Sequence, residues 1–253
     1  MTDGPLEDPI AEAGRIGEAA KKAGVKVKLL GGAGINLHSP SASRPPLKRK
    51  YGDLDYAIAK KQRKGVLDLF PTLGYEANDR FNLMNGDRRL YFYDGAHSRQ
   101  VDVFIDVFKM SHVIDLRGRL DGDGPCATPS DLLLSKLQIY EVNRKDLVDV
   151  IALLLDHPIA EGDDDAIDPR YIARLACEDW GLCRTVQLNI ARLIQTLDEL
   201  DVDRELVRSR VKELWAAVET GPKPLRWKLR AQVGDRMPWY VLPEEVRSPY
   251  QPE

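Results

Sequence analysis

Hydrophobic residues in the first half of the chain recur in short runs that Gly and Pro interrupt. Ile and Ala stand at helical spacing between Asp8 and Ala23, which predicts a helix there. Runs with period-two alternation or many β-forming residues predict strands over residues 25–30, 52–58, 88–94 and 99–108, and the run over 65–75 predicts a helix leading into a further strand. The runs over 88–94 and 99–108 are joined by a turn, DGAHS, and we expect them to pair as a meander.

Residues 39–50 interrupt this pattern. The segment is rich in Pro and small polar residues, and its prolines remove backbone donors. We therefore expect a mobile loop without regular structure.

The second half of the chain changes character after a Gly- and Pro-rich segment at residues 122–129. Leucine-rich helical spacing predicts helices over residues 130–142, 143–156, 168–179, 181–197 and 203–219, the first with Ser130 as its N-cap. We predict an α/β (α+β) domain with a mixed sheet over residues 1–125. A C-terminal helical bundle domain follows over residues 126–253.

Composition excludes several classes of protein. Of the 253 residues, 43% are hydrophobic and 30% are charged, which excludes a disordered chain. No run approaches the roughly 18–20 apolar residues that span a bilayer, and the acidic start lacks the apolar core of a secretory signal. The three cysteines form no CxxC pair, so we expect reduced thiols in a cytoplasmic protein. The net charge of −3 does not indicate a nucleic-acid-binding protein as a whole.

Carboxylates recur on two of the predicted strands. Period-two geometry places Asp53 and Asp55 on one face of a strand, and Asp102 and Asp106 on one face of a later strand. Neighbouring carboxylates repel each other unless a cation lies between them, and all-oxygen ligands suit Mg²⁺ or Mn²⁺. A D-x-D pair with a third carboxylate from an adjacent strand is able to hold two metal ions.

Two simpler interpretations stand beside the metal site. Acidic residues that alternate with apolar ones also mark the solvated face of an edge strand. A pair such as Gly31 and Gly32 also serves simply to end a strand. The order of the features, a strand, a Gly-Gly turn and a helix, then a D-x-D strand and an acidic strand, favours the metal site.

These segments resemble the DNA polymerase β-like nucleotidyltransferase superfamily. The matching runs are LLGGAGINL (29–37), YGDLDYAI (51–58) and VDVFIDVF (101–108). LLLSKLQIYEVNRKDLVDVIALL (132–154) is similar to the helical segment of the AbiEii-like and MenT-like toxin nucleotidyltransferases. The resemblance extends over about residues 25–156 and implies a nucleotidyltransferase fold with a mixed sheet, followed by a helical bundle.

The resemblance also implies roles for the carboxylates. Asp53, Asp55 and Asp102 would be the catalytic residues and the ligands of Mg²⁺ or Mn²⁺, and Asp102 would also help to deprotonate the acceptor hydroxyl. Asp106, which shares the predicted face of Asp102, is the alternative third carboxylate.

It implies a nucleotide-binding set as well. Gly31 and Gly32 would let backbone amides approach the β- and γ-phosphates, Lys136 would contact the triphosphate or the pyrophosphate, and Asp146 matches the family's helical aspartate. The sequence departs from the family at Ala33, where a Ser or Thr hydroxyl often binds phosphate. Lys136 and Asp146 also fit ordinary helix-surface residues.

The function implied is a metal-dependent nucleotidyltransferase. It would move an NMP from an NTP such as ATP to an acceptor hydroxyl and release pyrophosphate. The acceptor would be an RNA or tRNA 3′ end, a protein or a small molecule, and the toxin resemblance favours RNA, with an antitoxin protein as a partner and no membrane partner. The alternatives are a catalytically inactive nucleotide- or RNA-binding module of the same fold, which Ala33 favours, and a structural partner protein with solvated acidic strands.

Four further features carry no assigned role in this prediction. Basic residues gather at 44–64 and, beside tryptophans, at 223–236, where they suit either a nucleic-acid backbone or a solvated surface. Those from Arg44 to Lys50 also suit an incoming triphosphate. His38 and His112 lie near the Gly-Gly turn and beyond the acidic strand, and a single histidine is more often a structural hydrogen-bonding group.

Overall fold

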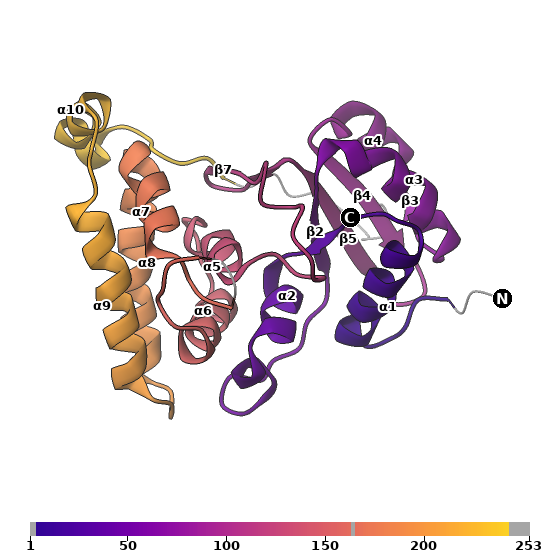
Figure 1. The fold of residues 1–253 in the computed structure, drawn as a ribbon, viewed down its shortest axis with the longest axis horizontal. Coiled ribbons are helices and arrows are strands. Elements are labelled where there is room, and N and C mark those ends of the chain that lie inside the picture. Colours follow the sequence, from indigo (N-terminus) through magenta and orange to yellow (C-terminus); the bar gives the residue numbers. More distant parts are fainter. Residues whose placement is uncertain (1–3, 163–164, 243–253) are drawn as a thin grey trace.

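The computed structural model describes residues 4–162 and 165–242 and shows a sheet at one end and a stack of helices at the other (Figure 1). Five strands form the sheet in the order β1-β2-β5-β4-β3. They are β1 (Lys28–Leu29), β2 (Leu54–Ile58), β3 (Glu76–Ala77), β4 (Arg89–Asp94) and β5 (Arg99–Ile105). β2 and β5 run parallel and the other neighbours run antiparallel, so the sheet is mixed, as predicted.

Helices of the first half of the chain cover one face of this sheet, and the other face packs toward the second half. The helices of the first half are α1 (Pro9–Lys22), α2 (Gly31–His38), α3 (Arg63–Thr72) and α4 (Asp79–Asn85), with 3₁₀ turns η1 (Pro40–Ser43) and η2 (Lys60–Gln62). Apolar residues of α1 and α3 pack on the face formed by Tyr56, Phe92 and Val103. The opposite face, which carries Ala57 and Phe104, packs toward the helical half of the chain.

The helical half follows a small hairpin of β6 (Val107–Lys109) and β7 (Val113–Asp115). Its helices are α5 (Pro129–Leu137), α6 (Arg144–Asp156), α7 (Pro169–Glu178), α8 (Trp180–Asp198), α9 (Arg204–Thr220) and α10 (Leu225–Val233), and the short turn η3 (Gly234–Arg236) ends it. α5 and α6 lie between α2 and the outer helices (Figure 1). The α+β class with a C-terminal helical bundle is confirmed.

One apolar core extends across the predicted boundary at residue 125. Leu30, Ile35 and Phe104 belong to the same buried cluster as Leu133 and Val150. The division into domains 1–125 and 126–253 stays a prediction, and the outermost residues of both ranges lie outside the described residues. In the described part of the chain, no helix is both long enough and apolar enough to cross a membrane.

Three local expectations are corrected. Residues 39–50 contain the 3₁₀ turn η1 and bury Leu47, and Ser41 donates from its backbone N–H and its hydroxyl to Asp156 at 2.8 and 2.6 Å. The segment is therefore docked on α6 through contacts that its composition did not reveal. The N-cap of α5 is Thr128, whose hydroxyl accepts from the N–H of Asp131, whereas Ser130 lies inside the helix.

The third correction concerns the acidic strand. β5 ends at Ile105, and Asp106 has a φ of 60°, a left-handed conformation that breaks the period-two pattern. Asp106 therefore does not continue the face of the strand that carries Asp102. The chain resumes as β6 in a separate two-stranded sheet.

Candidate active site

Asp55 and Asp102 stand side by side on the two central strands. They are direct register partners in the parallel pair of β2 and β5. Since residues opposite each other on neighbouring strands project to the same face, both side chains project from the face of Ala57 and Phe104, toward the helical half. The hydrophobic-in alternation of Leu54, Tyr56 and Ile58 forces Asp55 onto that face.

Asp53 and Asp106 take different positions. Asp53 directly precedes β2, and its Oδ1 accepts from the backbone N–H of Gln100 at 3.3 Å, which holds it beside the start of β5. Oδ1 of Asp106 accepts from the backbone N–H of Lys60 at 2.9 Å, at the opposite end of β2. Asp102 is thus the carboxylate that the fold brings next to the D-x-D pair.

The three carboxylates are electrostatically strained. Burial raises the pKa of Asp55 to about 7, and the neighbouring Asp102 adds to the rise. Burial also raises the pKa of Asp53, which keeps an exposed edge, and that of Asp102. Neighbouring negative charges and burial both disfavour ionisation of these carboxylates, so a bound cation would stabilise their ionised form.

Arg89 is the cation that the protein itself supplies. Its Nε donates to Oδ1 of Asp102 at 2.7 Å and partly opposes the rise in the pKa of that carboxyl. The guanidinium lies 5.0 Å from the ring centre of Phe104, on the same face of the sheet. Within the described residues, Asp102 therefore has one ion-pair partner, Arg89.

The Gly-Gly turn lies directly against Asp55. Gly31 has a φ of 61°, and a Cβ at this position would collide with Oδ2 of Asp55. A Cβ on Gly32 would collide with the guanidinium of Arg49. α2 starts at Gly31 with no side-chain cap on Leu30, so amide groups at its N-terminus stay open to an anion.

Lys136 and Asp146 form part of a buried ionic network beside this turn. Nζ of Lys136 lies 2.5 Å from Oδ1 of Asp146 and 3.3 Å from Oδ2 of Asp149. Asp149 in turn accepts two hydrogen bonds from Arg49, at 2.8 and 2.5 Å. Burial opposes the charge of Lys136, but the two aspartates more than offset it and raise its pKa.

The network also acts on Asp55 and lies against the start of α2. Lys136 favours the ionised form of Asp55 through its charge. The guanidinium of Arg49 stacks 4.1 Å from the ring centre of Tyr51, two residues before Asp53. Lys136 is 8% exposed, so it is a buried ion-pair partner and not a surface lysine.

The donor set fits a divalent cation. Asp53, Asp55 and Asp102 offer only carboxylate oxygens, which Mg²⁺ and Mn²⁺ prefer. The absence of a Cβ at Gly31 keeps Oδ2 of Asp55 accessible from the side of α2. Among the described residues, Arg89 contacts Asp102, whereas the charges of Lys136 and Arg89 act on Asp55 without an ion pair.

Other residues singled out from the sequence have structural partners. His112 is buried, its Nε2 lies 2.8 Å from the hydroxyl of Thr185, and burial lowers its pKa. In the second basic stretch, Trp227 donates to the carbonyl of Ala176 and Arg230 donates to the carbonyl of Gly234. These contacts stabilise the outer helices.

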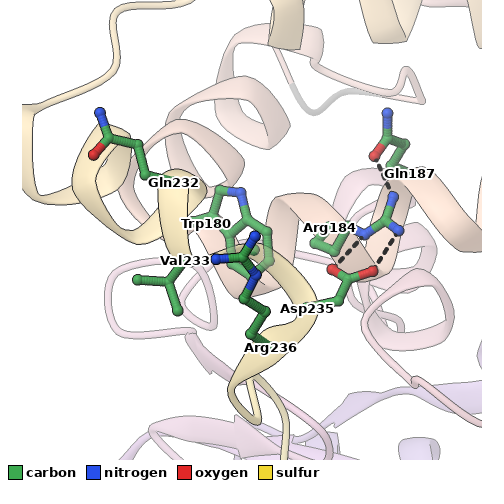
Figure 2. A pocket seen from close by; sticks show the side chains of 8 residues that line it. Trp180, Arg184, Gln187, Gln232, Val233, Asp235 and Arg236 are labelled. Atoms are coloured by element: carbon green, nitrogen blue, oxygen red, sulfur yellow. Dashed lines mark hydrogen bonds and ion pairs between the residues drawn. The ribbon is translucent and has the colours of Figure 1, made fainter.

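A hollow on the outer helices lies away from the carboxylates. Figure 2 shows it between α8 and the turn after α10, with Arg184 paired to Asp235 through bonds of 3.0 and 2.7 Å. Trp180, Gln187 and Arg236 complete its lining. It contains none of the predicted site residues.

Two arginines of the site escaped the sequence prediction. Arg89 opens β4, where its only signal was a charged residue at the start of a β-rich run. Arg49 lies in a basic segment, KRK, in which nothing distinguishes it from Lys48 and Lys50. Its partner Asp149 is 100 residues away in the sequence, so only the tertiary fold reveals the pair.

Comparison with known proteins gives limited similarity. No family model and no curated protein matches the sequence. Among solved structures, an antigenic nucleotidyltransferase-like protein from Paracoccidioides brasiliensis is similar with a TM-score of 0.41 at 14% identity, covering 87% of this chain and 96% of that chain. The STING-associated CdnE c-di-GMP synthase from Capnocytophaga granulosa has a TM-score of 0.28 at 13% identity, covering 84% and 81% of the two chains. Because these scores are low, we base the function on the residues of the site.

Proposed function

We propose that the protein is a metal-dependent nucleotidyltransferase that moves an NMP from an NTP to an acceptor hydroxyl and releases pyrophosphate. The observation that carries the proposal is the pairing of Asp55 and Asp102 in register on β2 and β5, beside the uncapped N-terminus of α2. A carboxylate pair that needs a cation lies next to amides that suit an anion. An Mg²⁺-bound triphosphate supplies both.

The chain's own groups would hold the triphosphate. The start of α2 has no side-chain cap, and its amides would bind the phosphates, while Gly31 and Gly32 let Asp55 and Arg49 lie directly against this turn. Lys136 and Arg49 are paired with Asp149 beside this turn and would hold it in place against the NTP. Ala33 donates no hydroxyl, so backbone amides carry the contact that a Ser or Thr gives elsewhere in the family.

The carboxylates would act at the acceptor. Asp53, Asp55 and Asp102 would hold Mg²⁺ or Mn²⁺, which when bound lowers the pKa of the acceptor hydroxyl and neutralises charge on the leaving pyrophosphate. Asp102 would also accept the proton of the acceptor hydroxyl. Arg89 orients this carboxylate through its 2.7 Å hydrogen bond.

For the acceptor we propose an RNA 3′ end, as the resemblance of residues 132–154 to toxin nucleotidyltransferases implies. The exposed Lys48 and Lys50 precede Asp53 in the sequence and support a polyanionic acceptor at this edge. A cytoplasmic location and an antitoxin partner belong to the same proposal.

The test is transfer of label. The purified protein is incubated with each α-labelled NTP, Mg²⁺ and total tRNA, in parallel with Asp55→Asn and with Asp106→Asn as a matched control. We expect labelled RNA with the wild type and with Asp106→Asn, and a loss of about a thousandfold with Asp55→Asn. Equal labelling by the wild type and Asp55→Asn would refute the proposed site.

A second candidate is a non-catalytic nucleotide- or RNA-binding module. The ion pair between Arg89 and Asp102 favours it, because the guanidinium already occupies one carboxylate oxygen. Metal-dependent NTP binding without transfer of label to RNA, protein or small-molecule acceptors would support this alternative.

A further inference from the structure

Two histidines and an aspartate converge at the end of α2 that is remote from Gly31. His38 is the last residue of α2, His157 directly follows α6, and Asp165 lies in the loop between α6 and α7. One potential ligand atom from each residue lies within 4.8 Å of the others. We propose that His38, His157 and Asp165 bind a transition-metal ion of the zinc type, at a site separate from the carboxylates of the sheet.

The spacing of the three groups suits such an ion. Nδ1 of His157 lies 2.9 Å from Oδ1 of Asp165, and the rings of His38 and His157 meet edge to face with centres 5.5 Å apart. In a tetrahedral zinc site with bonds of about 2.0–2.1 Å, neighbouring ligand atoms are roughly 3.3 Å apart. A zinc ion would bind between Nδ1 of His157 and Oδ1 of Asp165 and would replace the present contact of Nδ1 with the backbone carbonyl of Asp165, at 3.1 Å.

His157 also has an outer partner of the kind that zinc ligands use. Its Nε2 lies 3.3 Å from the hydroxyl of Ser39. Hydrogen bonds from the second ring nitrogen fix the tautomer and orientation of a metal-bound histidine. His157 would thus keep Nε2 for Ser39 and offer to the ion its Nδ1, which now contacts Asp165.

The loop that carries Asp165 is closed on itself. The N–H of Ala160 donates to the carbonyl of Ile167 at 3.1 Å, and the N–H of Ile167 donates to the carbonyl of Pro158 at 2.9 Å. Asp165 has a φ of 61° at this closure. Its side chain is 81% exposed whereas that of His157 is 2% exposed, so the site has an entry path and room for a water ligand.

The donor types distinguish this site from the carboxylate cluster. Two imidazole nitrogens and one carboxylate oxygen suit Zn²⁺, whereas Mg²⁺ prefers oxygen ligands alone. A helix of eight residues such as α2 is about 12 Å long, which separates the two sites. A bound ion would fasten the end of α2 to the end of α6 and so stabilise the helix whose other end faces Asp55.

The experiment measures metal binding directly and needs no activity. Untagged protein is freed of metal by chelation and titrated with Zn²⁺ by calorimetry, with Co²⁺ as a spectroscopic probe of tetrahedral nitrogen and oxygen ligands. We expect one ion per chain and at least tenfold weaker binding in His38→Ala and in Asp165→Asn. Zn²⁺ should raise the unfolding temperature of the wild type more than that of either variant.

Two controls locate the ion. His97→Ala removes another histidine that contacts an aspartate, Asp94 at 2.8 Å, and should leave Zn²⁺ binding unchanged. Asp55→Asn should also leave it unchanged, which keeps this proposal independent of the nucleotidyltransferase. Since the side chain of Asp165 is exposed, its substitution tests the site without disturbing the core. Absence of Zn²⁺ binding, or equal affinity in wild type, His38→Ala and Asp165→Asn, would overturn the proposal.

Discussion

Two groups of charged side chains lie beside the start of α2 and differ in how their charges are compensated. In the first, Lys136, Asp146, Asp149 and Arg49 neutralise one another through hydrogen bonds of 2.5–2.8 Å. In the second, Asp55 forms no ion pair within residues 4–162 and 165–242, and burial raises its pKa to about 7. Both groups use the same residue types, yet only the first is complete within the protein.

We infer from this difference that the ionic network of Lys136 is structural, whereas the carboxylates around Asp55 bind a ligand. A buried charge is tolerated where a partner removes its desolvation penalty. The ionic network meets this condition and joins the segment before β2 to α5 and α6. The cluster of Asp53, Asp55 and Asp102 meets it only in part, through Arg89, and this shortfall is what a divalent cation would supply.

The strongest test of the comparison removes the cation from the complete network. Lys136→Met leaves Asp146 without its lysine and should lower the free energy of unfolding by about 3–5 kcal/mol, the usual effect of breaking a buried ion pair. Chemical denaturation measures this. The double variant Lys136→Met with Asp146→Asn should recover part of the loss, and a change below about 0.5 kcal/mol in the single variant would mean that Lys136 behaves as a surface residue.

In the cluster of Asp53, Asp55 and Asp102, by contrast, removing a charge should stabilise the fold. The carboxyl of Asp55 ionises near 3.8 in the unfolded chain and near 7 in the folded one, so the unfolded state gains as the pH rises between these values. Without metal at pH 8, Asp55→Asn should therefore raise the unfolding temperature by roughly 5 °C. The gain should shrink toward pH 4, where the carboxyl is protonated in the folded state and only partly ionised in the unfolded state.

Mg²⁺ is the control for this pH effect. It should stabilise the wild type at pH 8 and narrow the gap to Asp55→Asn, because the ion requires the ionised carboxylate. Calorimetric scans from pH 4 to pH 8 measure both effects. A destabilised Asp55→Asn at pH 8 without metal would show that the carboxylate is already compensated.

A smaller effect is expected at the glycine between the two groups. Gly31→Ala imposes a side chain at a φ of 61° and against Oδ2 of Asp55, and should lower the rate of NMP transfer by about 10–100-fold. Gly118→Ala is a matched control, because its φ is 79° and a Cβ there meets open space. Both variants should lose about 1–2 kcal/mol of stability, and an equal loss of activity in both would show that strain alone is responsible.

The smallest effect is expected at Asp106. Asn is tolerated in the left-handed region and its side-chain oxygen still accepts from the N–H of Lys60, so Asp106→Asn should keep its stability within about 0.5 kcal/mol. The rate of NMP transfer should stay within about twofold of the wild type. A large loss of activity would return Asp106 to the site as the third carboxylate.

Periodicity predicted the parts of the fold that local patterns determine. The helix before β1, the meander of β4 and β5 and the long helices of the second half all follow from spacing and turn residues. The docked segment 39–50 and the end of β5 at Ile105 depend on distant contacts. The bonds from Ser41 to Asp156 and from Asp106 to Lys60 join residues 115 and 46 positions apart, which no local pattern reveals.

The site was predictable to a similar extent. The D-x-D alternation placed Asp55 on a strand face, and the fold brings Asp102 beside it. The sequence left Asp102 and Asp106 as alternatives, because a strand ending in a left-handed residue looks like a continuing strand. Arg89 and Arg49 were missed because a charge next to a strand indicates no particular partner until the tertiary fold supplies one.

The most direct test of the central claim is a crystal structure of the protein with Mn²⁺ and a non-hydrolysable NTP. The anomalous signal of manganese identifies the ion. We predict manganese bound by Asp55 and Asp102, with the triphosphate at the N-terminus of α2. An NTP bound elsewhere, or no manganese at these carboxylates while Arg89 still pairs with Asp102, would contradict the account.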